Sequence, residues 1–325
     1  SLNLIVLDKL TYAGNLKTIE KELDRINFIK GDICDKELVN NIFFKNGIDF
    51  VVNFAAETHV DRSIENSELF LKTNILGTHN LIENAKIHWE IGENQYKENK
   101  CFLQISTDEV YGSLDSEGYF TEKTPLNPRS PYSASKAGAD LLVSSYVETY
   151  NFPAMISRCS NNYGPYQFPE KLIPLTIKNI MESKKIPIYG NGENVRDWIY
   201  VVDHCKAIDL VLEKGKIGEV YNIGGNSERR NIEVVKTVID ILKELKDFNE
   251  IDYSLIEYIK DRKGHDKRYA IDSTKIKNDL GWLPEMDFEN GIRETINWYL
   301  NNEDWLNSVV SGEYEEYYKR IYGER

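Results

Sequence analysis

Short apolar runs alternate with longer helix-compatible segments over the first half of the chain. Continuous apolar runs of this length are typical of strands that are buried on both faces of a parallel sheet. They lie at 4–7, 28–29, 50–54, 102–105 and 155–158. The segments between them that carry apolar or small residues compatible with helices are 36–45, 69–85 and 132–150. This alternation predicts an α/β protein with a doubly wound parallel sheet.

The alternation loosens after about Pro165, and one clear amphipathic helix, 231–245, stands out beyond it. We therefore predict two units. Residues 1–165 form the main sheet domain, and residues 166–325 form a smaller α/β lobe whose chain returns in part to the first domain. The chain has 325 residues, 41% of them hydrophobic, which is sufficient for a large core.

Composition excludes several classes of function. The formal net charge of −13 argues against a nucleic-acid-binding face, although a few local arginines can still hold a small anionic ligand. The four cysteines show no CxxC spacing, no apolar run reaches about 18 residues, and we find no signal peptide. These features predict a soluble, cytoplasmic protein. The five histidines form no HxH or HExxH pattern, so we expect no metal site.

The first apolar run ends at Asp8, where dinucleotide-binding folds place an acid that binds the adenosine ribose. In such folds a glycine-rich turn lies about 20 residues before this acid. No such turn precedes Asp8. We therefore expect a strand, a glycine loop and a helix to be missing at the N-terminus of this chain. Ala55 and Ala56 follow the third run, and their small side chains would let a flat ring or a pyrophosphate approach the backbone.

The sharpest candidate for chemistry is the segment Ser106–Gly112, which follows the buried run 102–105. Its two adjacent carboxylates, Asp108 and Glu109, would stand at the carboxyl end of a strand, where ligands bind in α/β sheets. The alternative is a solvated turn with two surface acids.

A second candidate is the pair Tyr132 and Lys136, which are four residues apart and share one face of a helix. An ammonium beside a phenol is expected to lower the tyrosine pKa, so that the pair could accept a proton from a substrate hydroxyl. The alternative is a surface tyrosine and lysine at helical spacing. The acid pair a short distance upstream favours the catalytic interpretation.

Two further segments carry weaker signals, and each has two possible interpretations. Asn161 and Asn162 follow the strand 155–158 and could form a turn or hydrogen-bond a sugar or an amide. The segment 261–268 concentrates basic side chains and could be an exposed charged loop or a phosphate site.

Together these residues resemble the extended short-chain dehydrogenase/reductase superfamily and, within it, the dTDP-glucose 4,6-dehydratases. The resemblance runs over essentially the whole chain. Its motifs are 8–15, 53–63, 106–112, 132–136, 160–174 and 194–198. The YxxxK pattern specifies only the superfamily. Thr-Asp-Glu at 107–109 is much more specific, because related epimerases typically lack both acids and related decarboxylases carry Ser-Glu instead.

The resemblance implies an NAD-dependent hydro-lyase that oxidises sugar C4, eliminates water across C5 and C6, and returns the hydride to C6. It implies Tyr132 as the base in the oxidation, with Lys136 tuning it and binding the nicotinamide ribose. It further implies Asp108 as the acid at C6, Glu109 as the base at C5 and Thr107 bonded to the 4-hydroxyl. Adjacent carboxylates in one pocket can take opposite roles because their pKa values can be pushed apart.

The resemblance also implies the binding residues and the partners. Those for NAD are Asp8, Lys9, Thr11, Asp32, Ile33, Ala55, Ala56 and Asn162. Those for the nucleotide sugar, expected to be dTDP-glucose, are His59, Asn161, Lys171, Leu172, Pro174, Tyr189, Arg196, Asn231, Arg262 and His265. Asp8 favours NAD over NADP, since a carboxylate repels a 2′-phosphate. A homodimer would form through the helices at 74–85 and 133–150, and rhamnose synthesis is the commonest destination of the family's product.

The chain departs from the family pattern at two places, and two alternative functions remain open. The glycine-rich loop is absent, and Lys263 replaces a proline that the family usually has in this loop. One alternative is a UDP-sugar 4-epimerase or a UDP-glucuronate decarboxylase on the same fold, against which Asp108 counts. The other is a non-catalytic nucleotide-sugar-binding protein. The complete set at 107–109, 132 and 136 counts against it.

Overall fold

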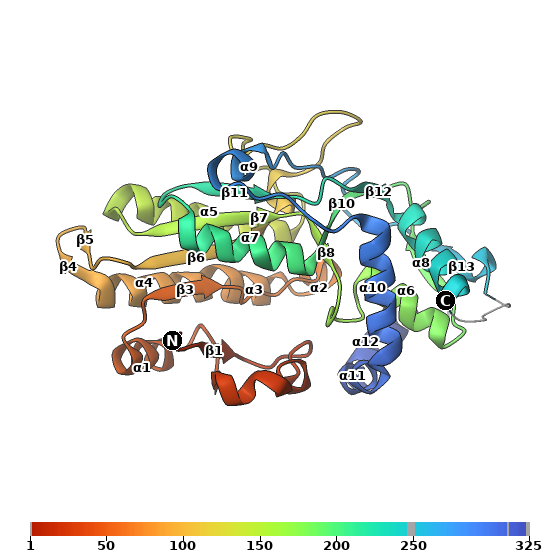
Figure 1. Cartoon of the computed structure of the whole chain (residues 1–325), viewed down its shortest axis with the longest axis horizontal. Coiled ribbons are helices and arrows are strands. Elements are labelled where there is room, and N and C mark those ends of the chain that lie inside the picture. Colours follow the sequence, from red (N-terminus) through yellow and green to blue (C-terminus); the bar gives the residue numbers. More distant parts are fainter. Residues whose placement is uncertain (1, 246–250, 311, 323–325) are drawn as a thin grey trace.

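The computed structural model describes residues 2–245, 251–310 and 312–322. Its main sheet is parallel and has the strand order β11-β7-β6-β3 (Figure 1). These strands are β3 (Phe50–Asn53), β6 (Cys101–Thr107), β7 (Ala154–Cys159) and β11 (Val220–Ile223). All seven residues of β6 are buried, as expected for a central strand of a parallel sheet.

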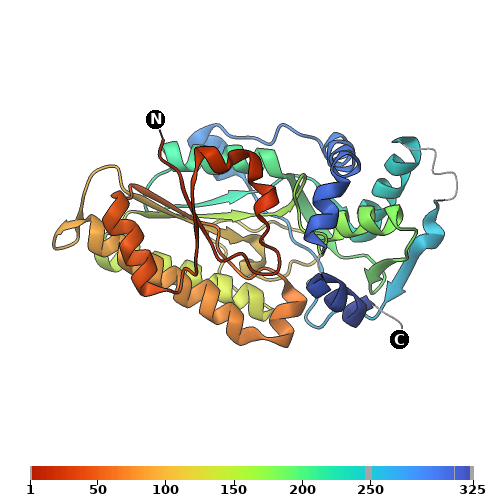
Figure 2. The ribbon, with the colours of Figure 1, turned by 90° about the horizontal axis from the view of Figure 1, so that it is seen from below.

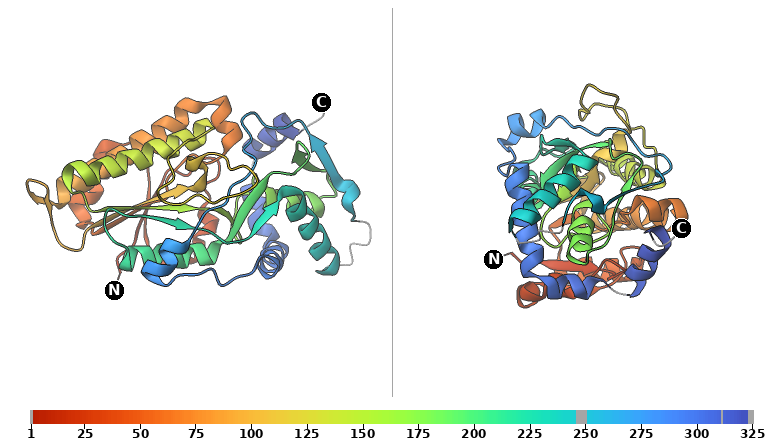
Figure 3. Two further views of the ribbon diagram at one scale, coloured as in Figure 1. Left: turned by 90° about the horizontal axis from the view of Figure 1, so that it is seen from above. Right: turned by 90° about the vertical axis from the view of Figure 1, so that its right-hand side faces the viewer.

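Helices cover both faces of this sheet. Successive side chains of β6 pack to opposite sides: Phe102 joins the apolar cluster of α4 (Thr78–Trp89) and α5 (Pro131–Tyr150), whereas Leu103 joins that of α7 (Val201–Lys214) and α9 (Thr274–Leu280). Figure 3 shows α4 and α5 along one face and α7 and α9 along the other. The predicted doubly wound α/β class is confirmed.

The first two strands do not join the main sheet. β1 (Ile5–Asp8) and β2 (Asn27–Lys30) pair in parallel as a separate two-stranded sheet beyond β3 (Figures 1 and 2). The apolar pattern had suggested one continuous sheet. α1 (Lys36–Asn46) follows β2, begins where Asp35 accepts a hydrogen bond from Leu38 N, and packs on α4.

The remaining helices of the first half lie between β3 and α5. They are α2 (Val60–Glu65), α3 (Ser67–Phe70) and the π-helix η3 (Leu71–Gly77), which runs directly into α4. The short hairpin β4 (Glu90–Gly92) and β5 (Gln95–Tyr96) follows α4. Short 3-10 helices lie at Leu16–Thr18, Glu20–Arg25 and Tyr253–Leu255.

A second lobe builds its own core from the later part of the chain. Its largest apolar cluster joins α6 (Leu172–Met181), α8 (Asn231–Leu245) and α10 (Phe288–Asn301). Beside them β10 (Val195–Tyr200) pairs with β8 (Asn161–Tyr163) and β12 (Glu228–Arg230), and β9 (Ile186–Tyr189) pairs with β13 (Ile256–Ile259). The chain returns to the first domain through α7, β11 and α9, so the division at residue 165 stays a prediction. The chain ends in α11 (Glu303–Val309) and α12 (Gly312–Tyr322).

Two composition-based expectations can be set beside the structure. All four cysteines are free thiols. Among the described residues, no helix combines the length and the apolar character that crossing a membrane requires.

Candidate active site

The acid pair stands where β6 ends and the 3-10 turn η4 (Asp108–Tyr111) begins. Thr107 caps this turn, because its Oγ1 accepts a hydrogen bond from Glu109 N at 3.3 Å and donates one to Asp108 Oδ1 at 3.2 Å. Asp108 is only 1% exposed, so the solvated-turn interpretation is wrong for this residue. Its Oδ2 is buried and has no hydrogen-bond partner among the described residues. A protonated Asp108 would therefore have a donor available for a ligand.

The two carboxylates have different electrostatic surroundings. Burial, and then the negative charges of Glu109 and Asp197, raise the pKa of Asp108 well above its ordinary value. Burial also raises the pKa of Glu109, but three cations oppose this rise. They are Arg262, Arg196 and Lys171. This arrangement favours a protonated Asp108 beside an ionised Glu109, which is the pattern of an acid and a base in one pocket.

Helix α5 brings Tyr132 to the same turn. Ser130 and Ser133 form a capping box and Pro131 occupies the first helical position, so the helix begins just before the tyrosine. Tyr132 is buried, and Thr107, Glu109 and Asp108 all act on its pKa. The sequence analysis had linked Tyr132 to the acids by their closeness in the chain and by the resemblance, and the fold brings them near enough for the acids to act on the pKa of Tyr132.

The expected lowering of the tyrosine pKa is wrong for this structure. Burial, together with the charge of Glu109, raises the pKa of Tyr132 well above its ordinary value. Lys136 does not counter this rise, because its Nζ donates to the backbone carbonyl of Ile105 at 2.6 Å. Burial lowers the pKa of Lys136 itself, against the opposing charge of Asp140. Helical spacing predicted a shared face but not which acceptor the ammonium would choose.

The predicted NAD residues follow the carboxyl ends of β1, β2 and β3. Asp8 ends β1, is exposed, and uses Oδ1 to accept a hydrogen bond from Leu10 N at 2.6 Å. Lys9 pairs with Asp32 at 2.8 Å, and Ile33 beside it is buried. Ala55 and Ala56 follow β3 directly, and Glu57 next to them acts on the pKa of Lys9. The loops after β1, β2 and β3, which are separate in sequence, therefore lie close together.

Asn162 lies on β8, away from these loops in sequence. Its Oδ1 is 2.8 Å from His204 Nδ1, and its amide nitrogen donates to Ser160 O at 3.1 Å. Sequence reasoning did not single out His204 as a partner of this residue. No spacing signal linked the two, since 42 residues separate them.

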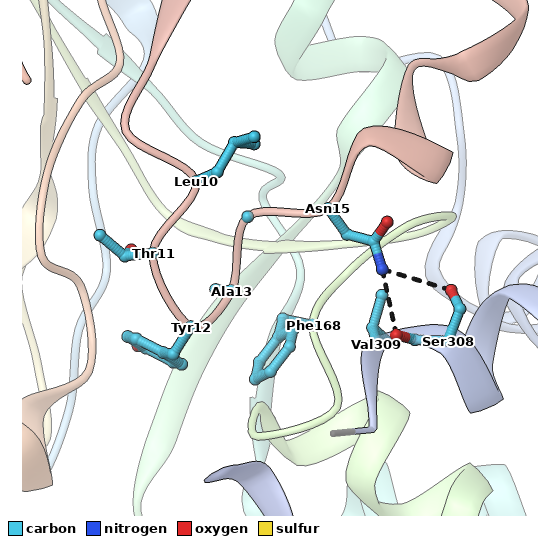
Figure 4. Close-up of a pocket in the computed structure, with 9 residues that line it drawn as sticks. Leu10, Thr11, Tyr12, Ala13, Asn15, Phe168, Ser308 and Val309 are labelled. Atoms are coloured by element: carbon cyan, nitrogen blue, oxygen red, sulfur yellow. Dashed lines mark hydrogen bonds between the residues drawn. The ribbon is translucent and has the colours of Figure 1, made fainter. Parts of the chain in front are cut away.

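A cavity of about 370 Å³ lies beside the loop that follows β1 and not at the acid pair. Residues 10–15 form one side of it, and Phe168, Ser308 and Val309 form the other (Figure 4). Asn15 joins the two sides by donating to Ser308 O at 3.1 Å. Of the residues predicted to bind NAD, only Thr11 lines this cavity. The C-terminal residues that close it carried no signal in the sequence.

Three of the residues predicted to bind the nucleotide sugar contact α2 or the residue Thr58 shortly before it. Lys171 donates to Thr58 O at 3.2 Å, and Tyr189 donates to Asp61 Oδ2 at 3.1 Å. Arg262 Nε stands 4.0 Å from the other oxygen of Asp61. Asp61 lay within a quoted motif but was not singled out, although it links two of the predicted residues.

The other basic residues of this set are held by their own lobe. Arg196 is buried, donates to Asp266 O at 3.0 Å and lies 4.2 Å from the ring centroid of Tyr269. His265 Nδ1 is 2.6 Å from Asp261 Oδ1, and burial lowers the pKa of His265 to about 4. The segment 261–268 is therefore not simply an exposed charged loop.

Five further predicted residues lie near or within regular elements, His59 in the first half of the chain and the other four in the second lobe. His59 is buried just before α2, and burial lowers its pKa well below the ordinary value. Asn161 begins β8, and Asn231 begins α8. Leu172 and Pro174 lie in the first turn of α6, where Pro174 is buried.

The chain is similar to known proteins over nearly its whole length. Residues 2–295 match the sequence model of a family described as GDP-mannose 4,6 dehydratase. The dTDP-glucose 4,6-dehydratase of Xanthomonas campestris pv. campestris is 49% identical over 318 residues, which cover 96% of this chain and 90% of the relative. A dTDP-glucose 4,6-dehydratase of Escherichia coli K12 is 46% identical over 331 residues, covering 98% and 92%.

Solved structures show the same fold. The DesIV dTDP-glucose 4,6-dehydratase of Streptomyces venezuelae, crystallised with NAD, matches with a TM-score of 0.87 at 43% identity, covering 94% of this chain and 90% of that one. The UDP-glucose 4-epimerase of Thermotoga maritima matches with a TM-score of 0.81 at 26% identity, covering 93% and 92%. Fold alone does not separate these two activities, whereas the sequence identity is higher with the dehydratases. The chain belongs to the dTDP-glucose 4,6-dehydratase family.

Proposed function

We propose that the protein is an NAD-dependent dehydratase that converts dTDP-glucose to dTDP-4-keto-6-deoxyglucose. The observation that carries the proposal is the pair Asp108 and Glu109 on one buried turn. Burial and two like charges, opposed by Arg196, raise the pKa of Asp108, whereas three cations and one acid, Asp266, act on Glu109. Dehydration at C5 and C6 needs one acid and one base at adjacent carbons, and this pair can supply both.

Oxidation at C4 is assigned to the first turn of α5. Tyr132 takes the proton of the C4 hydroxyl, and Thr107, which acts on the pKa of Tyr132, holds the same hydroxyl. Lys136 binds the nicotinamide ribose. NAD, when bound, would supply the hydride transfer from C4 and back to C6, and its positive charge would favour the phenolate of Tyr132.

Elimination is assigned to the acid pair. The 4-ketone acidifies the C5 proton, which Glu109 removes as a carboxylate. Asp108 gives its proton to the C6 hydroxyl, which leaves as water, so that a double bond forms between C5 and C6. A return of the proton from Glu109 to C5 accompanies reduction at C6 and restores the ionised base.

The loops at the ends of β1, β2 and β3 fit NAD. The exposed carboxylate of Asp8 suits a ribose and disfavours a 2′-phosphate, and Ala55 and Ala56 carry no side chain that would keep a dinucleotide from the backbone. The residues assigned to NAD are Asp8, Lys9, Thr11, Asp32, Ile33, Ala55, Ala56 and Asn162. Structures of similar dehydratases from Streptomyces venezuelae and Bacillus anthracis with NAD support this assignment.

The nucleotide sugar is assigned to the cationic side of the pocket. Lys171, Arg196 and Arg262 act on Glu109 and would pair with the diphosphate, since guanidinium forks match phosphate oxygens. The other residues of this set are His59, Asn161, Leu172, Pro174, Tyr189, Asn231 and His265. The names of the relatives support dTDP-glucose as the substrate.

The deciding experiment is a product assay with the protein, NAD, and one of three substrates: dTDP-glucose, UDP-glucose or UDP-glucuronate. We expect a 4-keto-6-deoxy sugar, detected by its absorbance in base, from dTDP-glucose. An epimerised sugar, or carbon dioxide released from UDP-glucuronate, would instead support the related epimerase or decarboxylase activities. Lack of product from every substrate, with retained binding, would support a non-catalytic protein.

We further propose that the protein forms a homodimer through η3, α4 and α5 and works in the cytoplasm. The dimer proposal rests on Leu71, Leu76 and Leu141, which are 47%, 60% and 60% exposed on packed neighbouring helices. Exposed leucines on neighbouring helices are typical of protein interfaces. The cytoplasmic location stays a prediction from the cysteine pattern.

A further inference from the structure

Asp140, Arg158 and Tyr111 form a buried polar network beneath the catalytic turn, called here the Asp140 network. They are 0%, 5% and 2% exposed. None of them is among the residues assigned above to the substrate or NAD. Each comes from a different element, since Asp140 lies on α5, Arg158 on β7 and Tyr111 at the end of η4.

The carboxylate of Asp140 joins α5 to two strands of the sheet. Its Oδ2 accepts hydrogen bonds from Ser106 Oγ at 2.9 Å and from Arg158 Nε at 2.8 Å. Asp140 also lies one helical turn after Lys136, and its charge raises the pKa of that lysine against the effect of burial. The helix that carries Tyr132 and Lys136 is thereby tied to the strand that carries the acids.

Arg158, which binds Asp140, also binds the hydroxyl of Tyr111. Its Nη1 donates to the hydroxyl of Tyr111 at 2.9 Å, and that hydroxyl donates to Asn222 Oδ1 at 2.8 Å. The ring of Tyr111 stacks on Phe120 with a centroid distance of 5.1 Å. Because Tyr111 is the last residue of η4, the turn with Asp108 and Glu109 is held by Thr107 at its start and by this hydroxyl at its end.

A contribution to stability alone gives a weak account of this network. Buried ion pairs are frequently no more stabilising than well-packed apolar side chains of the same volume. A phenylalanine at 111 would retain the ring and its stacking on Phe120. What the hydroxyl adds is a fixed position, and a displacement of about 1 Å in a catalytic group can cost on the order of 100-fold in rate.

We propose that the hydroxyl of Tyr111, held by Arg158 and Asp140, positions the turn that carries Asp108 and Glu109 and thereby serves the elimination step. This inference rests on the proposed dehydratase function. Tyr111 is a positioning residue, since it acts through the turn and touches neither substrate nor cofactor. Sugar binding and oxidation at C4 depend on other elements and are expected to be affected little.

The test compares Tyr111→Phe with wild type and with Tyr221→Phe. Tyr221 is an equally buried tyrosine on β11, and its hydroxyl accepts a hydrogen bond from Lys216 N outside the network. For Tyr111→Phe we expect kcat to fall about 10-fold to 100-fold with KM unchanged. In single turnover, the absorbance of NADH should rise at the wild-type rate and decay more slowly. Tyr221→Phe should match wild type in both.

Thermal unfolding shows whether each variant is folded at the assay temperature. Asn222→Ala, which removes the acceptor of the Tyr111 hydroxyl and lies on β11 away from Lys136, should show the same selective loss and serves if Tyr111→Phe does not fold. Wild-type turnover in both variants would overturn the proposal, and so would an equal slowing of NADH formation and decay. A wild-type protein without product from dTDP-glucose would overturn the proposed function, and this inference with it.

Discussion

At the scale of single residues, the site separates two carboxylates that are adjacent in sequence. Asp108 has a like charge near it, Asp197, and a buried oxygen without a hydrogen-bond partner among the described residues. Glu109 faces cations from three distant segments. One position is thereby suited to hold a proton and the other to accept one. The neighbouring charges, and not the residue type, determine which carboxylate is the acid and which is the base.

Removal of the acid should block the second half of the reaction more than the first. In Asp108→Asn the amide keeps the shape but supplies no proton to the departing hydroxyl, so product formation should fall about 10²- to 10⁴-fold. Reduction of NAD by dTDP-glucose in single turnover should change far less. Formation of the 4-keto-6-deoxy product at the normal rate would contradict the assignment.

The pH dependence of kcat should report the raised pKa of Glu109. The base must be ionised, so activity is lost as pH falls through this pKa, and the acid limb should lie above the ordinary range of glutamate. Arg262 lowers the pKa of Glu109, so Arg262→Gln should move the acid limb to higher pH at saturating substrate. Arg293→Gln, which removes an exposed arginine paired with Glu244, is the control. An acid limb that does not move in Arg262→Gln would argue against Glu109 as the base.

At the scale of elements, two local devices aim the catalytic groups. The capping box of Ser130 and Ser133 fixes where α5 begins, and therefore where Tyr132 stands. Gly112 ends the acid turn with a φ of +91°, a conformation that favours glycine. Both devices are short sequence patterns with a defined geometric result.

Loss of the helix cap should destabilise the protein modestly. Ser130→Ala removes the side chain that accepts from Ser133 N at 3.0 Å, and we expect the free energy of unfolding to fall by about 1 kcal/mol. Ser145→Ala, at an exposed serine in the same helix, should have a much smaller effect. Chemical denaturation of both variants measures the difference. Equal stability of the two would show that the cap contributes nothing.

Gly112 should tolerate a side chain less well than Gly118. A Cβ at Gly112 would lie 2.4 Å from Asn127 O, whereas at Gly118, with a similar φ of +87°, nothing lies within 4 Å. Backbone strain is common to the two, so the difference isolates the clash. We expect Gly112→Ala to lower the free energy of unfolding by about 1–3 kcal/mol more than Gly118→Ala. Denaturation curves that coincide would refute the steric argument.

At the scale of the whole molecule, the site depends on both lobes. The acid turn and Tyr132 come from the main sheet and α5, whereas Lys171, Arg196 and Arg262 come from the second lobe. A rotation of one lobe against the other would therefore change the charge around Glu109. The main domain also has exposed leucines on η3 and α5. These leucines are distant in sequence from the three cations.

The proposed dimer should weaken when this face is charged. Leu76→Lys or Leu141→Lys replaces a leucine expected to be buried between subunits, and burial of one leucine is worth about 1.5–3 kcal/mol. The dissociation constant should therefore rise at least about tenfold. Tyr258→Lys, at a residue 58% exposed in the second lobe, is the matched control. Sedimentation over a range of concentrations measures this, and a wild-type monomer would contradict the proposal.

The sequence by itself determined the α/β class and the location of the acid pair. Buried parallel strands read as continuous apolar runs, so 50–54, 102–105 and 155–158 revealed three strands of the main sheet, and the two acids followed one of them directly. The resemblance to a family also rested on short motifs, which sequence displays directly. These are local properties, and a linear pattern contains them.

Only the tertiary structure decided the arrangement of the strands and the charges. The separate pairing of β1 and β2, and the raised pKa of Tyr132, both departed from expectation. So did the choice of Ile105 O as the acceptor for Lys136. The physical reason is that hydrogen bonding between strands, desolvation and Coulomb interactions depend on which distant segments meet. No periodicity records those encounters, and the folded chain determines them.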